Sequence, residues 1–79
     1  MRRAKLLYLL RIVWEIGPAP NREIAREAGL YPKVCYPILY QLEQDGYIEH
    51  RRREQYDITE RGRGVLTSEK KQSQGKLFS

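Results

Sequence analysis

Three consecutive arginines, at residues 51–53, are the most concentrated cationic feature of the chain. They lie in the stretch EHRRREQYD, with Glu49 and Glu54 close on either side. Guanidinium groups can hold phosphate oxygens through paired hydrogen bonds, but runs of arginine also occur in localisation signals and on solvated surfaces. The meaning of the run therefore depends on the element that carries it and on what precedes it.

A second group of candidate recognition residues lies upstream of the arginines. The apolar residues there follow helical i, i+3, i+4, i+7 spacing at Cys35, Ile38, Leu39 and Leu42. This predicts a helix from about Pro32 to Asp45 with one buried face. The opposite face then carries Lys33, Val34, Tyr36, Pro37, Tyr40, Gln41 and Gln44. Glutamine amides hydrogen-bond to base edges, adenine being the favoured partner, and lysine binds guanine or phosphate.

No catalytic or metal-binding set is recognisable. The chain has one histidine, His50, and one cysteine, Cys35, so neither an internal disulfide nor a zinc cluster of thiolates is expected. No serine lies beside a base and there is no glycine-rich phosphate loop. Cys35 falls on the apolar stripe, where a small buried hydrophobe is expected rather than a redox-sensing thiol. We expect no enzyme, no cofactor, no metal and, in so small a core, no small-molecule ligand.

Composition restricts the partners. The 79 residues predict one domain, and the formal net charge of +5 favours nucleic acid or an anionic surface. No apolar run approaches the roughly 20 residues of a membrane span. The single cysteine is compatible with a reducing compartment, so we expect a cytoplasmic protein that does not bind membranes.

The remaining pattern predicts the elements that position these residues. A first helix from about Arg3 to Ile16 has one apolar face made of Leu6, Leu9, Leu10, Val13 and Ile16. Leu7, Tyr8 and Trp14 lie on another side, with little core left to cover them, and exposed apolar groups often mark partner surfaces. A linker and a short second helix follow, with Asn21 expected as N-cap and Gly29 as the terminating left-handed residue.

The arginine run falls between two groups of strand-forming residues. Tyr47 and Ile48 precede it, and Tyr56 and Ile58 follow it, which predicts a two-stranded hairpin. Thr59 is expected to cap a last helix. The predicted order of helix, helix, helix, strand, strand, helix is a winged helix-turn-helix, mainly α with a small β-hairpin. We expect the domain to span residues 1–67 and a flexible polar tail to span residues 68–79.

The stretch CYPILYQLEQDGYIEHRRREQYDITERGRGVL resembles the winged-helix transcriptional regulators of the PadR group. The matching positions of the recognition helix are Tyr36-Pro37 and Leu42-Glu43, followed by Gly46 and the strand residue Ile48. At the end of the wing Tyr56 and Thr59 match, and Gly62 and Leu66 match after it. The resemblance covers roughly residues 20–66 and implies sequence-specific DNA binding and transcriptional repression. PadR-like proteins usually carry further C-terminal helices that form the dimer. About a dozen residues follow Leu66, so we expect a smaller dimer built on the first helix.

With this fold, the second helix of the helix-turn-helix enters the major groove of double-stranded DNA. The predicted DNA-binding residues are Arg22, Arg26, Lys33, Tyr36, Pro37, Tyr40, Gln41, Gln44, Arg51, Arg52 and Arg53. The arginines are expected on phosphates or in the minor groove, while Tyr36, Pro37 and Gln41 are expected to select the sequence. Glu49 and Glu54 are expected to orient or restrain the arginines.

A homodimer is predicted, with Leu7, Tyr8, Trp14, Leu77 and Phe78 at its interface. The residues leave two alternatives open. A winged helix can serve as a protein-interaction module of a transcription assembly, and the same cations can bind structured RNA. The basic wing favours DNA over the first of these.

Overall fold

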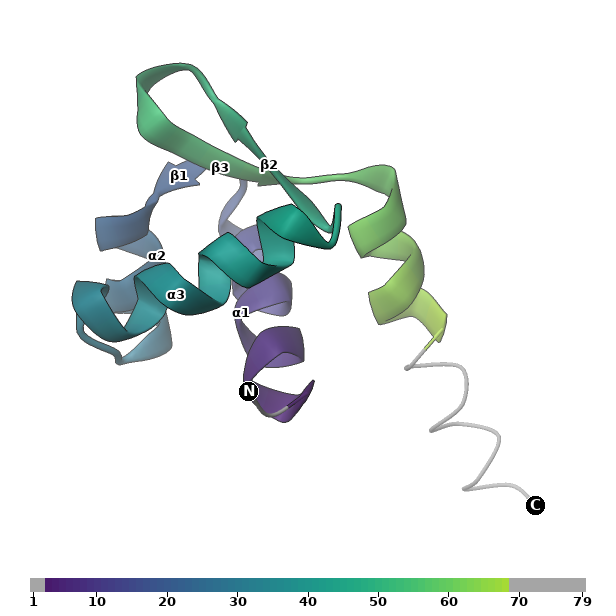
Figure 1. Ribbon diagram of the computed structural model, residues 1–79, viewed down its shortest axis with the longest axis horizontal. Coiled ribbons are helices and arrows are strands. Elements are labelled where there is room, and N and C mark those ends of the chain that lie inside the picture. The colour runs from purple at the N-terminus through teal and green to yellow at the C-terminus, as the bar shows by residue number, and fades with distance from the viewer. Residues whose placement is uncertain (1–2, 69–79) are drawn as a thin grey trace.

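The computed structural model describes residues 3–68, which form a winged helix (Figure 1). The elements are α1 (Arg3–Ile16), β1 (Ala19–Pro20), α2 (Asn21–Ala28), α3 (Pro32–Gln44), β2 (Ile48–Arg51), the 3₁₀ turn η1 (Arg52–Glu54) and β3 (Gln55–Ile58). A last helix spans residues 60–68. The predicted order of three helices, a hairpin and a final helix is confirmed, and β1 and η1 are additions to it.

The wing is one hairpin of a three-stranded antiparallel sheet with the strand order β1-β3-β2. In the hairpin, Ile48 lies opposite Ile58 and His50 lies opposite Tyr56. Tyr56 also pairs with Ala19 of β1, a segment that the sequence indicated as a linker. Two residues give no alternation to recognise, and Pro20 lacks an N–H to donate to the ladder. β1 is a strand because it pairs with β3.

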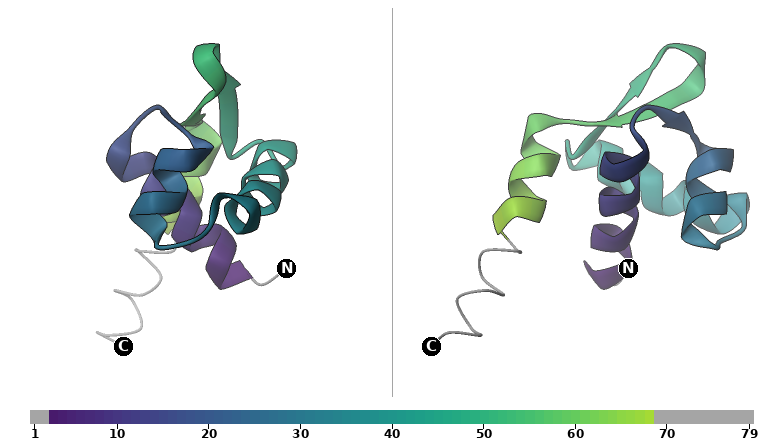
Figure 2. Two further views of the ribbon diagram at one scale, coloured as in Figure 1. Left: turned by 90° about the vertical axis from the view of Figure 1, so that its left-hand side faces the viewer. Right: turned by 180° about the vertical axis from the view of Figure 1, so that it is seen from behind.

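Helices α1, α2 and α3 meet around one core beneath the sheet (Figure 2). The predicted apolar stripes face one core: Leu9, Leu10 and Val13 of α1 are buried with the whole stripe of α3, while Leu6 and Ile16 at the ends of the α1 stripe are partly buried. The α3 stripe is Cys35, Ile38, Leu39 and Leu42. These contacts fix the rotation of α3 about its axis and turn its polar and aromatic side chains outward.

The turn between α2 and α3 sets the angle of the helix-turn-helix. Gly29 ends α2 with φ +73°, as predicted, and the N–H of Leu30 donates to the carbonyl of Ala25 at 2.9 Å. The prediction that Asn21 is the N-cap of α2 is wrong. Pro20 occupies that position without a side-chain hydrogen bond, and Asn21 is already helical. Its Nδ2 donates instead to the carbonyl of Pro32 at 3.2 Å, which joins the starts of α2 and α3.

Thr59 links the end of α3, both wing strands and the last helix. Its hydroxyl donates to the carbonyl of Gly46 at 2.7 Å and accepts the N–H of Gly62 at 3.1 Å, so it caps the last helix as predicted. Its own N–H donates to the carbonyl of Tyr47 at 3.1 Å. One residue therefore closes the base of the wing and starts the helix behind it.

Gly62 allows this close junction. A Cβ at Gly62 would overlap the carbonyl of Tyr47 and lie 2.8 Å from Cγ1 of Ile58, whereas a Cβ at Gly64 would meet no atom within 4 Å. The two glycines lie in the same helix and lower its intrinsic propensity equally. Only Gly62 is required by packing.

Gly62→Ala should therefore lower the free energy of unfolding by about 1–3 kcal/mol, because it forces the last helix away from backbone that cannot yield. Gly64→Ala is the matched control and should raise it by about 0.5–1 kcal/mol through helix propensity. Urea unfolding followed by circular dichroism measures both. Equal effects of the two substitutions would contradict the packing argument.

Candidate nucleic-acid interface

The outward face of α3 has the exposure that the sequence predicts. Tyr36 and Tyr40 are 54% and 52% exposed, although both are large aromatic residues. The other members of the face are also exposed: Lys33, Val34, Pro37, Gln41 and Gln44. Pro37 lies inside the helix without ending it. The structure therefore gathers every residue predicted on this face into one solvent-accessible strip along α3.

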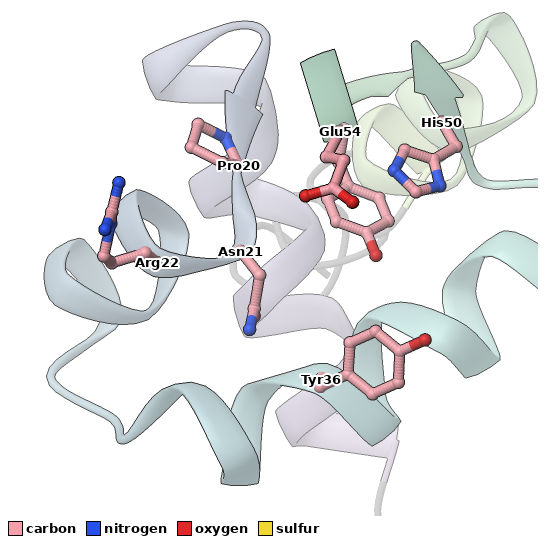
Figure 3. Close-up of a pocket in the computed structure, with 7 residues that line it drawn as sticks. Pro20, Asn21, Arg22, Tyr36, His50 and Glu54 are labelled. Carbon is pink, nitrogen blue, oxygen red and sulfur yellow. The ribbon is translucent and has the colours of Figure 1, made fainter. Parts of the chain in front are cut away.

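A cleft separates this strip from the wing. Its volume is about 450 Å³, and it is lined by Pro20, Asn21, Arg22, Tyr36, His50, Glu54 and Tyr56. Figure 3 shows Tyr36 on the α3 side, His50 and Glu54 on the wing side, and Asn21 and Arg22 at the start of α2. Residues of β1, α2, α3 and the wing thus converge on one opening, which no contiguous sequence motif could indicate.

Aromatic stacking stiffens the wing wall of the cleft. The rings of His50 and Tyr56 are 4.6 Å apart and nearly parallel, at 12°. They stand directly opposite each other in the ladder between β2 and β3. Burial raises the pKa of the Tyr56 phenol above its ordinary value, and the nearby Tyr36 phenol adds to this. Tyr56 therefore remains an uncharged hydroxyl at neutral pH. His50 lies in β2 and lines this wall of the cleft.

The three wing arginines do not have equivalent surroundings. The Arg51 guanidinium lies 2.9 Å from a carboxylate oxygen of Glu49 and 3.2 Å from one of Asp57. Asp57 is itself fixed, because its carboxylate also accepts the N–H of Ile58. Arg51 is thus held along the sheet. Among the described residues, Arg52 and Arg53 form no ion pair and are exposed.

The tip of the wing turns through two left-handed residues. Arg53 and Glu54 have φ of +60° and +57°, a conformation that costs side-chain-bearing residues roughly 1–2 kcal/mol each. The turn carries Arg53 on the exposed tip and brings Glu54 to the cleft. The expectation that both glutamates restrain arginines is therefore correct for Glu49 and wrong for Glu54, which pairs with none of the described arginines.

The arginines of α2 and of the last helix also differ in their surroundings. Arg22 lines the cleft, whereas Arg26, one turn further along α2, is exposed but does not. Arg61 stacks on the ring of Tyr47, with its guanidinium carbon 5.3 Å from the ring centre.

The outer side of α1 is exposed where the sequence indicated a partner surface. Trp14 is 42% exposed and borders a hollow of about 470 Å³ with Arg11, Glu15, Leu66 and Thr67. Leu7 is half-buried against the core. Tyr8 is half-exposed, and its hydroxyl donates to the carbonyl of Ala28 at 3.2 Å, so it also fastens α1 to α2. Leu77 and Phe78, predicted at the same interface, lie outside the described residues.

Within residues 3–68, no group of three or more histidine, cysteine and acidic residues could hold a metal ion. No helix in that part of the chain combines the length and the apolar character needed to cross a bilayer. Cys35 is fully buried, as expected from its place on the apolar stripe.

No protein-family profile matches this chain, and no curated protein is a significant match. Among solved structures, the MarR-family protein Rv2887 of Mycobacterium tuberculosis in complex with DNA superposes with a TM-score of 0.71 at 25% identity. That match covers 81% of this chain and 50% of the other.

The same protein in complex with p-aminosalicylic acid superposes with a TM-score of 0.66 at 22% identity, covering 80% of this chain and 52% of the other. The chain thus spans about half the length of this neighbour. The fold is that of the winged-helix regulators, and the neighbour is a regulator of MarR kind rather than an enzyme. The narrower PadR assignment is not confirmed.

Burial makes the Cys35 thiol unreactive in the folded state. Loss of solvent raises its pKa from 9.0 to about 11. Between these values the unfolded chain loses the proton while the folded chain keeps it, so the free energy of unfolding should fall as pH rises above 9. At pH 8, a thiol reagent should modify the native protein only at the rate of unfolding. Rapid modification under native conditions would contradict this and reopen a redox role.

Proposed function

We propose that this chain is a sequence-specific regulator of transcription that binds double-stranded DNA, acting as a repressor. One observation carries the proposal: an exposed polar and aromatic strip on the second helix of a helix-turn-helix lies beside a basic wing. The structural neighbour with the same fold was solved with DNA, which supports the same partner here. The basic net charge of +5 agrees with a polyanionic ligand.

In this proposal α3 lies in the major groove, where base pairs present distinct patterns of donors and acceptors. The first half of α3 holds Lys33, Tyr36 and Pro37, and these residues lie closest to the base edges in the groove. Tyr40, Gln41 and Gln44 extend the contact along the groove. Tyrosine hydroxyls reach phosphates, glutamine amides read bases, and the Pro37 ring offers an apolar surface for thymine methyl groups.

The wing and the start of α2 hold the backbone that flanks this groove. Arg52 and Arg53 are exposed at the tip of the wing, where their guanidinium groups can enter the minor groove or pair with phosphates. Arg22 stands at the cleft, where the N-terminus of α2 has no side-chain cap to occupy its free N–H groups. We assign a phosphate of the strand between the two grooves to the Arg22 side of that opening. Arg26 is assigned to the adjacent phosphate on the exposed side of α2.

Among winged-helix regulators, the Tyr36-Pro37 pair and the wing residues Tyr56, Thr59 and Gly62 support a PadR-like assignment. The PadR-like resemblance implies a dimer, and we assign the dimer contact of this chain to the outer side of α1. Leu7, Tyr8 and Trp14 contribute from the described part, and Leu77 and Phe78 are assigned to the same contact. Two recognition helices would then lie about 34 Å apart on a palindromic site.

Salt dependence of binding tests the proposal. Affinity for duplex DNA should fall steeply between low and moderate salt, because phosphate contacts release counterions. Arg52→Ala and Arg53→Ala should each reduce the slope of log K against log salt by about one unit. Arg51→Ala is the matched control from the same run: its guanidinium is held by Glu49 and Asp57, so the slope should change less. Fluorescence anisotropy across a salt series measures all three.

Two results would redirect the proposal. Absence of duplex binding at low salt would reject it and favour a protein-interaction module. Tighter binding to structured RNA than to any duplex would favour RNA as the partner, because the same cations serve both. Equal slopes for the three arginine variants would contradict the distinct assignment of Arg51.

Sedimentation tests the dimer. At tens of micromolar the chain should sediment as a dimer, and Trp14→Ala should shift it toward monomer because it removes the largest exposed ring of α1. Tyr31→Ala is the control, because Tyr31 is 74% exposed but lies in the turn between α2 and α3. A strictly monomeric parent chain would reject the dimer and leave single-site DNA binding to be tested separately.

A further inference from the structure

Asp45 lies at a position where an acidic side chain destabilises the helix that it ends. It is the C-cap of α3, and no basic residue occupies the last turn of that helix. The C-terminus of a helix carries the negative end of the macrodipole, so a carboxylate there is repelled rather than stabilised. In the proposed complex, Asp45 would also bring negative charge toward DNA. A residue that opposes both helix stability and DNA binding needs another explanation.

The one described partner of the Asp45 side chain is Gln41, one turn earlier. Nε2 of Gln41 lies 3.2 Å from each oxygen of the Asp45 carboxylate. Asp45 forms no ion pair with any of the described cations. Its other neighbours around a small hollow are apolar: Leu6, Leu7, Leu10, Leu42, Tyr47 and Val65. The carboxylate therefore has little to hold it except the amide of a predicted base-reading residue.

The chemistry of this pair is directional. An ionised carboxylate only accepts hydrogen bonds, so the amino end of the Gln41 amide must face Asp45 and the carbonyl end must face away. A free glutamine amide can turn over and exchange its donor and acceptor ends. Glutamine–aspartate pairs four residues apart are a known stabilising contact on helices. The pair thus limits the amide to one of its two orientations.

We infer that Asp45 is a positioning residue for base recognition by Gln41, an inference that rests on the proposed function. With its amino end held by Asp45, Gln41 presents Oε1 to the groove as an acceptor. The exocyclic amino groups of adenine and cytosine are the major-groove donors that match it, whereas the exocyclic oxygens of thymine and guanine do not. Asp45 thereby biases one position of the binding site toward adenine or cytosine.

A base-preference assay with variants tests the inference. The wild-type chain, Gln41→Ala and Asp45→Asn are bound to a duplex library randomised over the site, and relative affinities are read by sequencing. Gln41→Ala identifies the position that Gln41 reads. Asp45→Asn should weaken the preference for adenine or cytosine at that same position by about twofold, because asparagine can accept or donate and no longer fixes the amide.

Two controls separate positioning from charge and from folding. Glu27→Gln removes the same charge from an exposed acidic residue of α2, and it should change affinity for all sequences alike without changing any base preference. Asp45→Glu keeps a carboxylate and should retain part of the preference. Asp45→Asn should fold at least as stably as wild type, because it relieves the repulsion at the end of α3, so lost preference cannot reflect unfolding.

The contact can also be observed without DNA. In the free protein, the side-chain amide resonances of Gln41 should differ between the wild-type chain and Asp45→Asn, because the carboxylate that accepts the amino group of Gln41 is lost. A Gln41 amide insensitive to Asp45 would overturn the inference. So would an Asp45→Asn variant that binds all sequences more tightly with its preference unchanged. A wild-type chain with no duplex binding would instead reject the proposed function, and the readout role with it.

Discussion

The hydroxyl of Thr59 and the backbone around it hold together the parts of the molecule that would meet a ligand. The hydroxyl bonds to Gly46 at the end of α3, while the Thr59 N–H bonds to Tyr47 at the start of β2. Gly62 closes the junction from the last helix, where a side chain would collide with Tyr47 and Ile58. The angle between wing and recognition helix depends on this junction, and with it the cleft between them. Buried backbone groups must be paired, so these hydrogen bonds fix the wing and the recognition helix against each other.

The geometry of the wing decides which of its arginines are paired with carboxylates and which are free of them among the described residues. Three adjacent arginines look equivalent in sequence, yet the strand geometry turns Arg51 along the sheet toward Glu49 and Asp57. Arg52 and Arg53 fall on the 3₁₀ turn beyond the ladder, where no described carboxylate holds them. Glu54 is turned toward the cleft by its left-handed backbone. The wing is thus a stiff stem with a basic tip, which agrees with the proposal that it holds a phosphate backbone rather than reads bases.

Much of the fold could be predicted because its signals are local. The helical spacing of apolar residues located α1 and α3, and the strand formers around the arginines located the hairpin. The errors involve long-range contacts. Asn21 was expected to cap α2 because its type suits a cap, but Pro20 takes that place while Asn21 bonds to Pro32 on the next helix. The strand β1 could not be predicted from Ala19 and Pro20, because its only signal is the distant strand that pairs with it.

The sequence by itself determined which residues of α3 face outward, because helical periodicity fixes the directions of side chains relative to a buried stripe. It also determined the basic tip of the wing, since the arginines lie between two runs of strand-forming residues. Only the tertiary structure decided that Arg22, Tyr36 and His50 line one cleft, that Arg51 is held while its neighbours are not, and that Asp45 engages Gln41. The first two depend on how separate elements pack and pair. The last required the actual side-chain orientation, which spacing of four residues permits but does not specify.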